Sequence, residues 1–147
     1  IAAAPAGIVA GFALDRPLPA PLEAEMLAIQ DEAHCGLLPA AMLPAMIGVQ
    51  RLRDAALADA ILAAAGDGSA PRVVLIAGAG HVRKDHGVGA LLRDRAPGLA
   101  TLAIGMAETG PGSEDRAALA REFDIVWFTP RAERPDPCED LRRKFAK

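Results

Sequence analysis

Residues 72–77, Arg-Val-Val-Leu-Ile-Ala, decide the fold class of this 147-residue chain. They form a continuous apolar run without alternation, which is typical of a strand covered on both faces of a sheet. The segments after it alternate in kind: a glycine-rich turn at 78–87, a helix at 88–95, a strand at 100–106, a helix at 113–122 and a strand at 125–128. Short connections between such segments imply right-handed crossovers and a parallel sheet between helix layers. The predicted fold class is therefore α/β.

The first half of the chain is predicted to be mainly helical. Residues 7–14 predict a short buried strand, which a proline-rich loop separates from a helix at 22–33. A short helical turn at 39–43 precedes a long helix at 44–65, because proline is well tolerated at a helix start. There are no internal repeats, and the length suits one domain over residues 1–147.

Composition and charge exclude several classes of protein. Hydrophobic residues make up 52% and charged residues 24%, as in an ordinary globular domain, so disorder is not expected. The net charge is −3 without any basic block, so we expect no nucleic-acid partner. No apolar run approaches the ~18 residues that span a bilayer, so no transmembrane segment is expected. The first residues carry neither an initiator methionine nor a signal-peptide n-region, from which we expect the natural protein to begin upstream.

Polar groups concentrate in the turn at 78–87, directly after the strongest predicted strand. This turn holds two imidazoles, two cations and one carboxylate, from His81, Arg83, Lys84, Asp85 and His86. Because ligands bind at the carboxyl ends of strands in open parallel sheets, the turn is the predicted binding site. Local capping and ion pairing is the alternative. A dinucleotide site is not expected, since Arg83 stands at the third glycine position of the GxGxxG pattern.

One face of the long predicted helix carries a second polar group. Gln50, Arg53 and Asp54 share this face by i+3 and i+4 spacing. The opposite face is apolar and is predicted to pack in the core; it consists of Met46, Val49, Leu52 and Ala56. The polar face is either solvated surface or the wall of a cleft beside the glycine-rich turn.

Histidine and cysteine spacing gives no strong metal or nucleophile motif. No pair among His34, His81 and His86 has the i, i+4 spacing of helical metal ligands, and there is no Gly-x-Ser-x-Gly elbow. Cys35 and Cys138 are expected to be free thiols in a reducing compartment or a pair in an oxidising one. Cys35 as a nucleophile beside His34 is disfavoured, because adjacent side chains rarely point at one another.

Four segments in order resemble the ChaN-like haem-binding uptake family, which is related to the Tiki and erythromycin-esterase groups. They are His-Cys-Gly-Leu-Leu-Pro at 34–39, Gln-Arg-Leu-Arg-Asp at 50–54, Gly-Ala-Gly-His-Val-Arg-Lys-Asp-His-Gly-Val at 78–88, and Asp-Ile-Val-Trp-Phe-Thr-Pro at 124–130 with Asp-Pro-Cys at 136–138. The resemblance implies a three-layer Rossmann-like domain with a mainly parallel sheet. It also implies that this chain lacks the N-terminal half of the family domain, with its Gly-Glu-x-x-His motif.

The resemblance implies haem as the cofactor and haem or iron uptake as the function. Two positions depart from the family pattern, since Ala79 replaces Asn and Gly89 replaces Pro. The chain has no tyrosine, so a phenolate ligand cannot come from it. The resemblance favours His81 as the axial ligand of the haem iron, ahead of His86 and Met106.

Further expectations follow from the same resemblance. Arg83 and Lys84 are expected to pair with the haem propionates. The predicted cofactor-binding set is completed by Asp85 and His86 in the turn and by Gln50, Arg53 and Asp54 on the helix. The implied location is periplasmic or outer-membrane-associated, as a lipoprotein, and it favours a disulfide between Cys35 and Cys138. A haem-bridged homodimer is conceivable.

The alternative function is hydrolysis, either metal-dependent or by a His/Glu pair, as in the esterase and Tiki protease relatives. His81 would be the general base, with Asp85 or Glu108 as its partner. A module that only binds a protein partner is the third reading.

Overall fold

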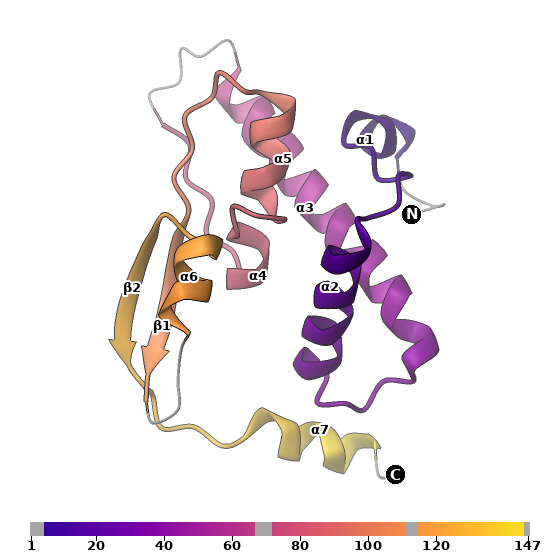
Figure 1. Cartoon of the computed structure of the whole chain (residues 1–147), viewed down its shortest axis with the longest axis vertical. Helices are drawn as coiled ribbons and strands as arrows, with labels where there is room; N and C mark the ends of the chain where they lie inside the picture. Colours follow the sequence, from indigo (N-terminus) through magenta and orange to yellow (C-terminus); the bar gives the residue numbers. More distant parts are fainter. Residues whose placement is uncertain (1–4, 67–71, 111–114, 146–147) are drawn as a thin grey trace.

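The computed structural model describes residues 5–66, 72–110 and 115–145. Helices dominate the first two thirds of the chain, and two strands follow (Figure 1). The elements are α1 (Ala6–Gly11), α2 (Ala20–Ala33), the 3-10 helix η1 (Ala40–Met42), α3 (Leu43–Ala65), α4 (Ala79–Val82), α5 (Val88–Arg95), β1 (Ile104–Thr109), α6 (Arg116–Glu122), β2 (Ile125–Pro130) and α7 (Pro137–Phe145).

Helix α3 is the central element, and α1, α2 and α5 all pack against it. Its helical start follows from proline in the first turn, where the missing N–H has no intrahelical partner. The buried cluster between α3 and α5 consists of Ala58, Val88 and Leu92. Alanine at the contact lets α5 approach α3 closely, which places the turn before α5 against the middle of α3.

Strands β1 and β2 pair in parallel, with Ile104 opposite Ile125 and Met106 opposite Trp127. Their first residues are fixed by Asp124, whose carboxylate accepts a hydrogen bond from the Ala103 N–H at 2.9 Å. The crossover between them is α6, as the sequence predicts. The described residues therefore form a mixed helix–strand fold with a two-stranded parallel sheet.

Two predicted strands are wrong. Residues 7–14 contain helix α1 followed by a turn, and no strand is found over residues 72–78. The run at 72–77 lacks a partner in the described part of the chain, and its side chains stay open: Val74 is 80% and Ile76 is 93% exposed. A strand requires a neighbour for its backbone groups, and local composition alone does not supply one.

Other boundaries shift by a few residues. The strand predicted at 100–106 lies at Ile104–Thr109, and the strand predicted at 125–128 extends to Pro130. The start of the helix predicted at 113–122 falls partly outside the described residues, and its described part begins at Arg116. Helix α7 was not predicted.

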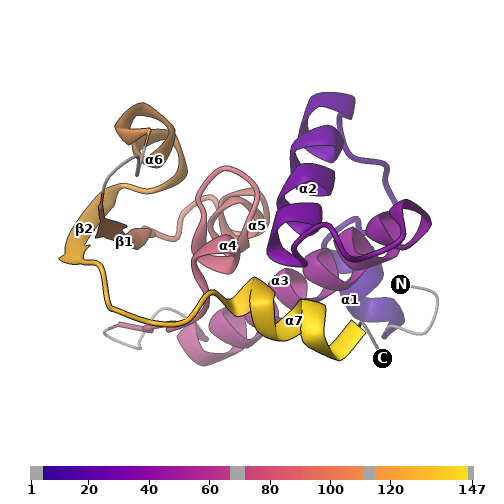
Figure 2. The ribbon, with the colours of Figure 1, turned by 90° about the horizontal axis from the view of Figure 1, so that it is seen from below.

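A disulfide joins the helical first part of the chain to its last helix, as predicted. Cys35, in the loop after α2, is bonded to Cys138, in the first turn of α7, with the two Cα atoms 5.7 Å apart. Figure 2 shows α7 returning from the sheet toward the helical half of the molecule. No helix in the described ranges is long and apolar enough to cross a membrane.

Candidate functional site

The glycine-rich turn folds into the short helix α4 and a tight loop that leads into α5. Gly87 makes this loop possible, since a Cβ there would lie 2.5 Å from the carbonyl oxygen of His81 and 2.8 Å from that of Arg83. Such distances exclude any larger residue unless the backbone moves. Gly87 therefore packs directly against the His81 and Arg83 carbonyls.

His81 points from α4 at the middle of α3. Its Nδ1 lies 2.6 Å from Oδ1 of Asp54 and 3.0 Å from Nε2 of Gln50. Gln50 and Asp54, two residues of the polar face of α3, thus lie against the turn. Arg53, on the same helix, is exposed.

The predicted core face of α3 is only partly correct, because Met46 and Leu52 are half-buried. Val49 and Ala56 are exposed, whereas Asp54 is buried together with four apolar residues of the helix, Leu43, Ile47, Ala55 and Ala58. Asp54 turns inward because Nδ1 of His81 satisfies one oxygen of its carboxylate, and Gln50 contacts the same ring nitrogen. The spacing of apolar residues along the helix, with alanine counted as apolar, did not distinguish its buried face from its exposed face.

Asp54 is the most deeply enclosed polar side chain of the site. The residue is 1% exposed, and its Oδ2 is buried without a hydrogen-bond partner among the described residues. Burial raises the pKa of Asp54 to about 6, while the hydrogen bond from His81 acts in the opposite direction. Above that pH the ionised carboxylate is an acceptor 2.6 Å from Nδ1, which favours the tautomer with the proton on Nδ1.

This arrangement leaves Nε2 of His81 as the ring nitrogen available to a ligand. No hydrogen bond from Nε2 to another described residue is found, and the side chain is 21% exposed. A histidine whose Nδ1–H is held by a carboxylate is the usual form of a metal ligand in proteins. The same pair also suits a general base.

Arg83 and Lys84, the predicted propionate ligands, are both engaged within the protein. Arg83 is 8% exposed, and its guanidinium forms ion pairs with Glu25 at 2.7 Å, Asp85 at 2.6 Å and Glu122 at 3.3 Å. Lys84 donates hydrogen bonds from Nζ to the Phe123 carbonyl at 2.7 Å and to Asp124 at 3.2 Å.

The remaining candidates lie away from His81. Glu108, at the end of β1, forms a bidentate ion pair with Arg134 at 2.6 and 2.8 Å. Met106 is exposed on β1. The carboxylate that contacts His81 is therefore Asp54, and neither Glu108 nor Asp85 is found in contact with it.

An apolar pocket of about 560 Å³ opens on the other side of the turn. Its walls come from the end of α3, residues 72–75, helix α5 and residues 99–104, and Val82 and Lys84 line it from the turn. His81 is not among the lining residues.

The comparison with protein families decides the assignment. The family model described as haem-binding uptake, Tiki superfamily, ChaN matches residues 7–92, which is more than half of the chain. The chain belongs to this family. The name of this family indicates haem-binding uptake.

Three of the four segments that resemble the ChaN family fall within the matched residues: those at 34–39, 50–54 and 78–88. His81, Asp54 and Gln50 therefore belong to the ChaN-matched part, and the segment at 124–138 lies beyond it. No curated protein and no solved structure matches the chain.

Proposed function

We propose that this protein binds haem during iron uptake and that His81 ligates the haem iron through Nε2. The observation that carries the proposal is the short contact between Nδ1 of His81 and the buried Asp54. A carboxylate in this position fixes the ring orientation, keeps the proton on Nδ1 and increases the electron density at Nε2. Bound haem would supply a redox-active iron, and His81 would hold that iron through Nε2.

Arg53 is the better propionate partner. It lies on α3 next to Asp54, is exposed, and is not found in an ion pair with any described residue. The two cations suggested by the sequence, Arg83 and Lys84, already hold carboxylates and carbonyls of the protein. Charge-assisted hydrogen bonds from a free guanidinium suit a carboxylate of the ligand.

We further propose a periplasmic or outer-membrane-associated location, as a lipoprotein. The Cys35–Cys138 disulfide supports an oxidising compartment. We also expect the two-stranded sheet to belong to a larger parallel sheet in a three-layer Rossmann-like domain. The unpaired run at 72–77 and the open apolar side chains of β1 and β2 support this expectation.

Haem titration followed by absorption spectroscopy tests the ligand assignment. The wild-type chain should give a saturable Soret shift, and His81→Ala should lose it because the iron loses its nitrogen ligand. His34→Ala is the matched control, since His34 is held by the Gln30 carbonyl at 2.7 Å outside the site. Equal shifts in wild type and His81→Ala, or no shift in wild type, would remove haem from this site.

Hydrolysis is the second candidate, and the same pair favours it. A histidine whose Nδ1 is held by a buried carboxylate is an arrangement that general bases use. The partner would be Asp54, and not Asp85 or Glu108. Ester hydrolysis that disappears in His81→Ala, in a protein that gives no Soret shift, would favour this function over haem binding.

A further inference from the structure

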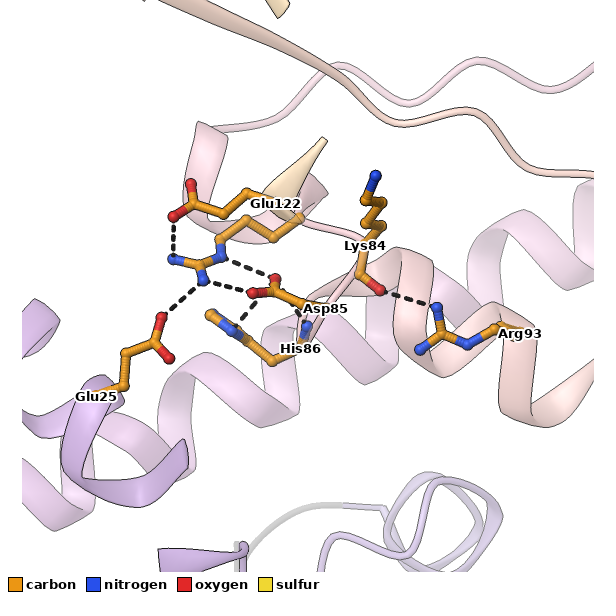
Figure 3. A network of polar contacts seen from close by, with 7 residues as sticks. Glu25, Lys84, Asp85, His86, Arg93 and Glu122 are labelled. Atoms are coloured by element: carbon orange, nitrogen blue, oxygen red, sulfur yellow. Dashed lines mark hydrogen bonds and ion pairs between the residues drawn. The ribbon is translucent and has the colours of Figure 1, made fainter. Parts of the chain in front are cut away.

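A second cluster of ligand atoms lies beside Arg83 and contains neither His81 nor Asp54. Glu25 comes from α2, while Asp85 and His86 come from the loop before α5, so distant parts of the chain meet here (Figure 3). One donor atom from each of the three residues lies within 4.8 Å of the other two. Imidazole nitrogen with two carboxylates is a ligand set used by divalent transition-metal ions.

His86 provides the independent sign of a missing ligand. Its side chain is only 6% exposed, and its Nδ1 is buried without a hydrogen-bond partner among the described residues. An unsatisfied buried polar atom is uncommon in native proteins, because it loses its contacts with water and gains nothing. The atom is directed at the cluster, since it lies 3.5 Å from Oδ1 of Asp85.

This separation suits two ligands of one metal ion better than a hydrogen bond. Zinc bonds of about 2.0–2.2 Å in tetrahedral geometry separate neighbouring ligand atoms by about 3.4 Å. The 3.5 Å between Nδ1 of His86 and Oδ1 of Asp85 is close to that value. An ion could therefore enter with little rearrangement of these two residues.

The charge of the cluster also favours a cation. Three carboxylates, from Glu25, Asp85 and Glu122, surround the single guanidinium of Arg83, which leaves two negative charges in excess. A divalent ion would balance the remaining charge.

Arg83 acts as a positioning residue. Its guanidinium holds Asp85 through both Nε and Nη2, at 2.9 and 2.6 Å, and reaches Oε1 of Glu25 at 2.7 Å. No hydrogen bond to Oε2 of Glu25 is found within the described residues, so that oxygen is open to a ligand. Fixing carboxylates by hydrogen bonds is the usual outer-shell role around a metal.

We propose that Glu25, Asp85 and His86 bind a divalent transition-metal ion of the zinc class. The site shares no residue with the His81–Asp54 pair and does not depend on the haem proposal. With three protein ligands, the ion keeps a fourth position for water or another small ligand.

Zn²⁺ titration of the metal-free full chain, in competition with a chromogenic chelator, tests the site. Glu25→Gln should weaken Zn²⁺ binding by about tenfold or more, because it removes a ligand oxygen. Glu122→Gln is the matched control: it removes the same charge next to Arg83 from a residue outside the ligand set, and it should weaken binding much less. His81→Ala should leave the affinity unchanged.

Nuclear magnetic resonance of the histidine rings gives a second readout. One equivalent of Zn²⁺ should shift the ring nitrogen signals of His86 in wild type and in His81→Ala. Equal weakening by Glu25→Gln and Glu122→Gln would reduce the effect to general charge and overturn the site. Zn²⁺ binding that disappears in His81→Ala, or that leaves the His86 ring signals unchanged, would overturn it too.

Discussion

Replacing Asp54 by asparagine should change how stability depends on pH, because the buried carboxylate is costly to ionise. Its pKa is raised by burial from the ordinary 3.8 to about 6 in the folded protein. Between these values the folded protein keeps a proton that the unfolded chain has released. Stability therefore falls as pH rises through this window, and the full penalty is present above it.

The size of the effect follows from the two pKa values. A pKa of about 6 against an ordinary 3.8 corresponds to about 3 kcal/mol of lost stability once the pH exceeds both. Asparagine has no proton to lose and avoids this penalty. The stability of Asp54→Asn relative to wild type should consequently rise by up to about 3 kcal/mol between about pH 4 and pH 7.

Urea unfolding followed by circular dichroism, repeated across this pH range, measures the difference directly. Subtracting the two proteins cancels the titration of the other carboxylates, and any constant cost of the asparagine amide drops out of the slope. Asp59→Asn is the matched control, since Asp59 is exposed on the same helix. A flat difference for Asp54→Asn, equal to that of the control, would refute the argument that burial governs Asp54.

Asp54→Asn should weaken haem binding although it raises the stability of the protein at neutral pH. Asparagine can still accept the Nδ1–H of His81, but it brings no charge to raise the basicity of the ring. Loss of such an outer-shell carboxylate weakens metal affinity by about ten- to a hundredfold. A variant that gains stability at neutral pH and loses haem affinity would show that Asp54 is kept for function.

Two further changes test the fold around the site. Replacing Cys35 and Cys138 by serine removes a covalent link between residues 103 positions apart. In the chain-entropy model this should lower the free energy of unfolding by about 4–5 kcal/mol. Urea unfolding measures the loss, and an unchanged midpoint would contradict the prediction. Gly87→Ala forces a Cβ against the carbonyl of His81 and should destabilise the protein by about 1–3 kcal/mol. Gly98→Ala is the control, because a Cβ at Gly98 would meet open space, and it should not destabilise the protein. Equal stability of the two variants would contradict the close packing at Gly87.

The elements that the sequence predicted well are those with strong local signals. Helices at 22–33, 44–65 and 88–95 appear within a few residues of their predicted bounds, because prolines, glycines and helical periodicity mark them. The runs at 7–14 and 72–77 are apolar and β-branched in the same way as true strands. Whether such a run pairs depends on a neighbour elsewhere in the chain, which a local pattern does not contain.

The candidate site shows the same division. His81 was predicted as a site residue because it stands in the glycine-rich turn, and its neighbours in the sequence are enough to single it out. Its partner Asp54 was included only as one member of a polar helix face, and the contact spans 27 positions. Glu25 was missed altogether, since it is one of several acidic residues on α2 and its meeting with Asp85 depends on how α2 packs.

The turn itself explains why two histidines only five residues apart behave differently. Helix α4 ends at Val82, and the buried Arg83 follows, so His81 faces α3 while His86 lies on the side of α2. His81 meets a buried carboxylate that holds its Nδ1–H, and His86 meets carboxylates that Arg83 already binds, which leaves its Nδ1 without a partner. One ring is thus anchored with Nε2 free, and the other is buried with Nδ1 free. Because the ring atoms left open differ, each histidine is suited to its own ligand, and substitution of either one should leave the other site intact.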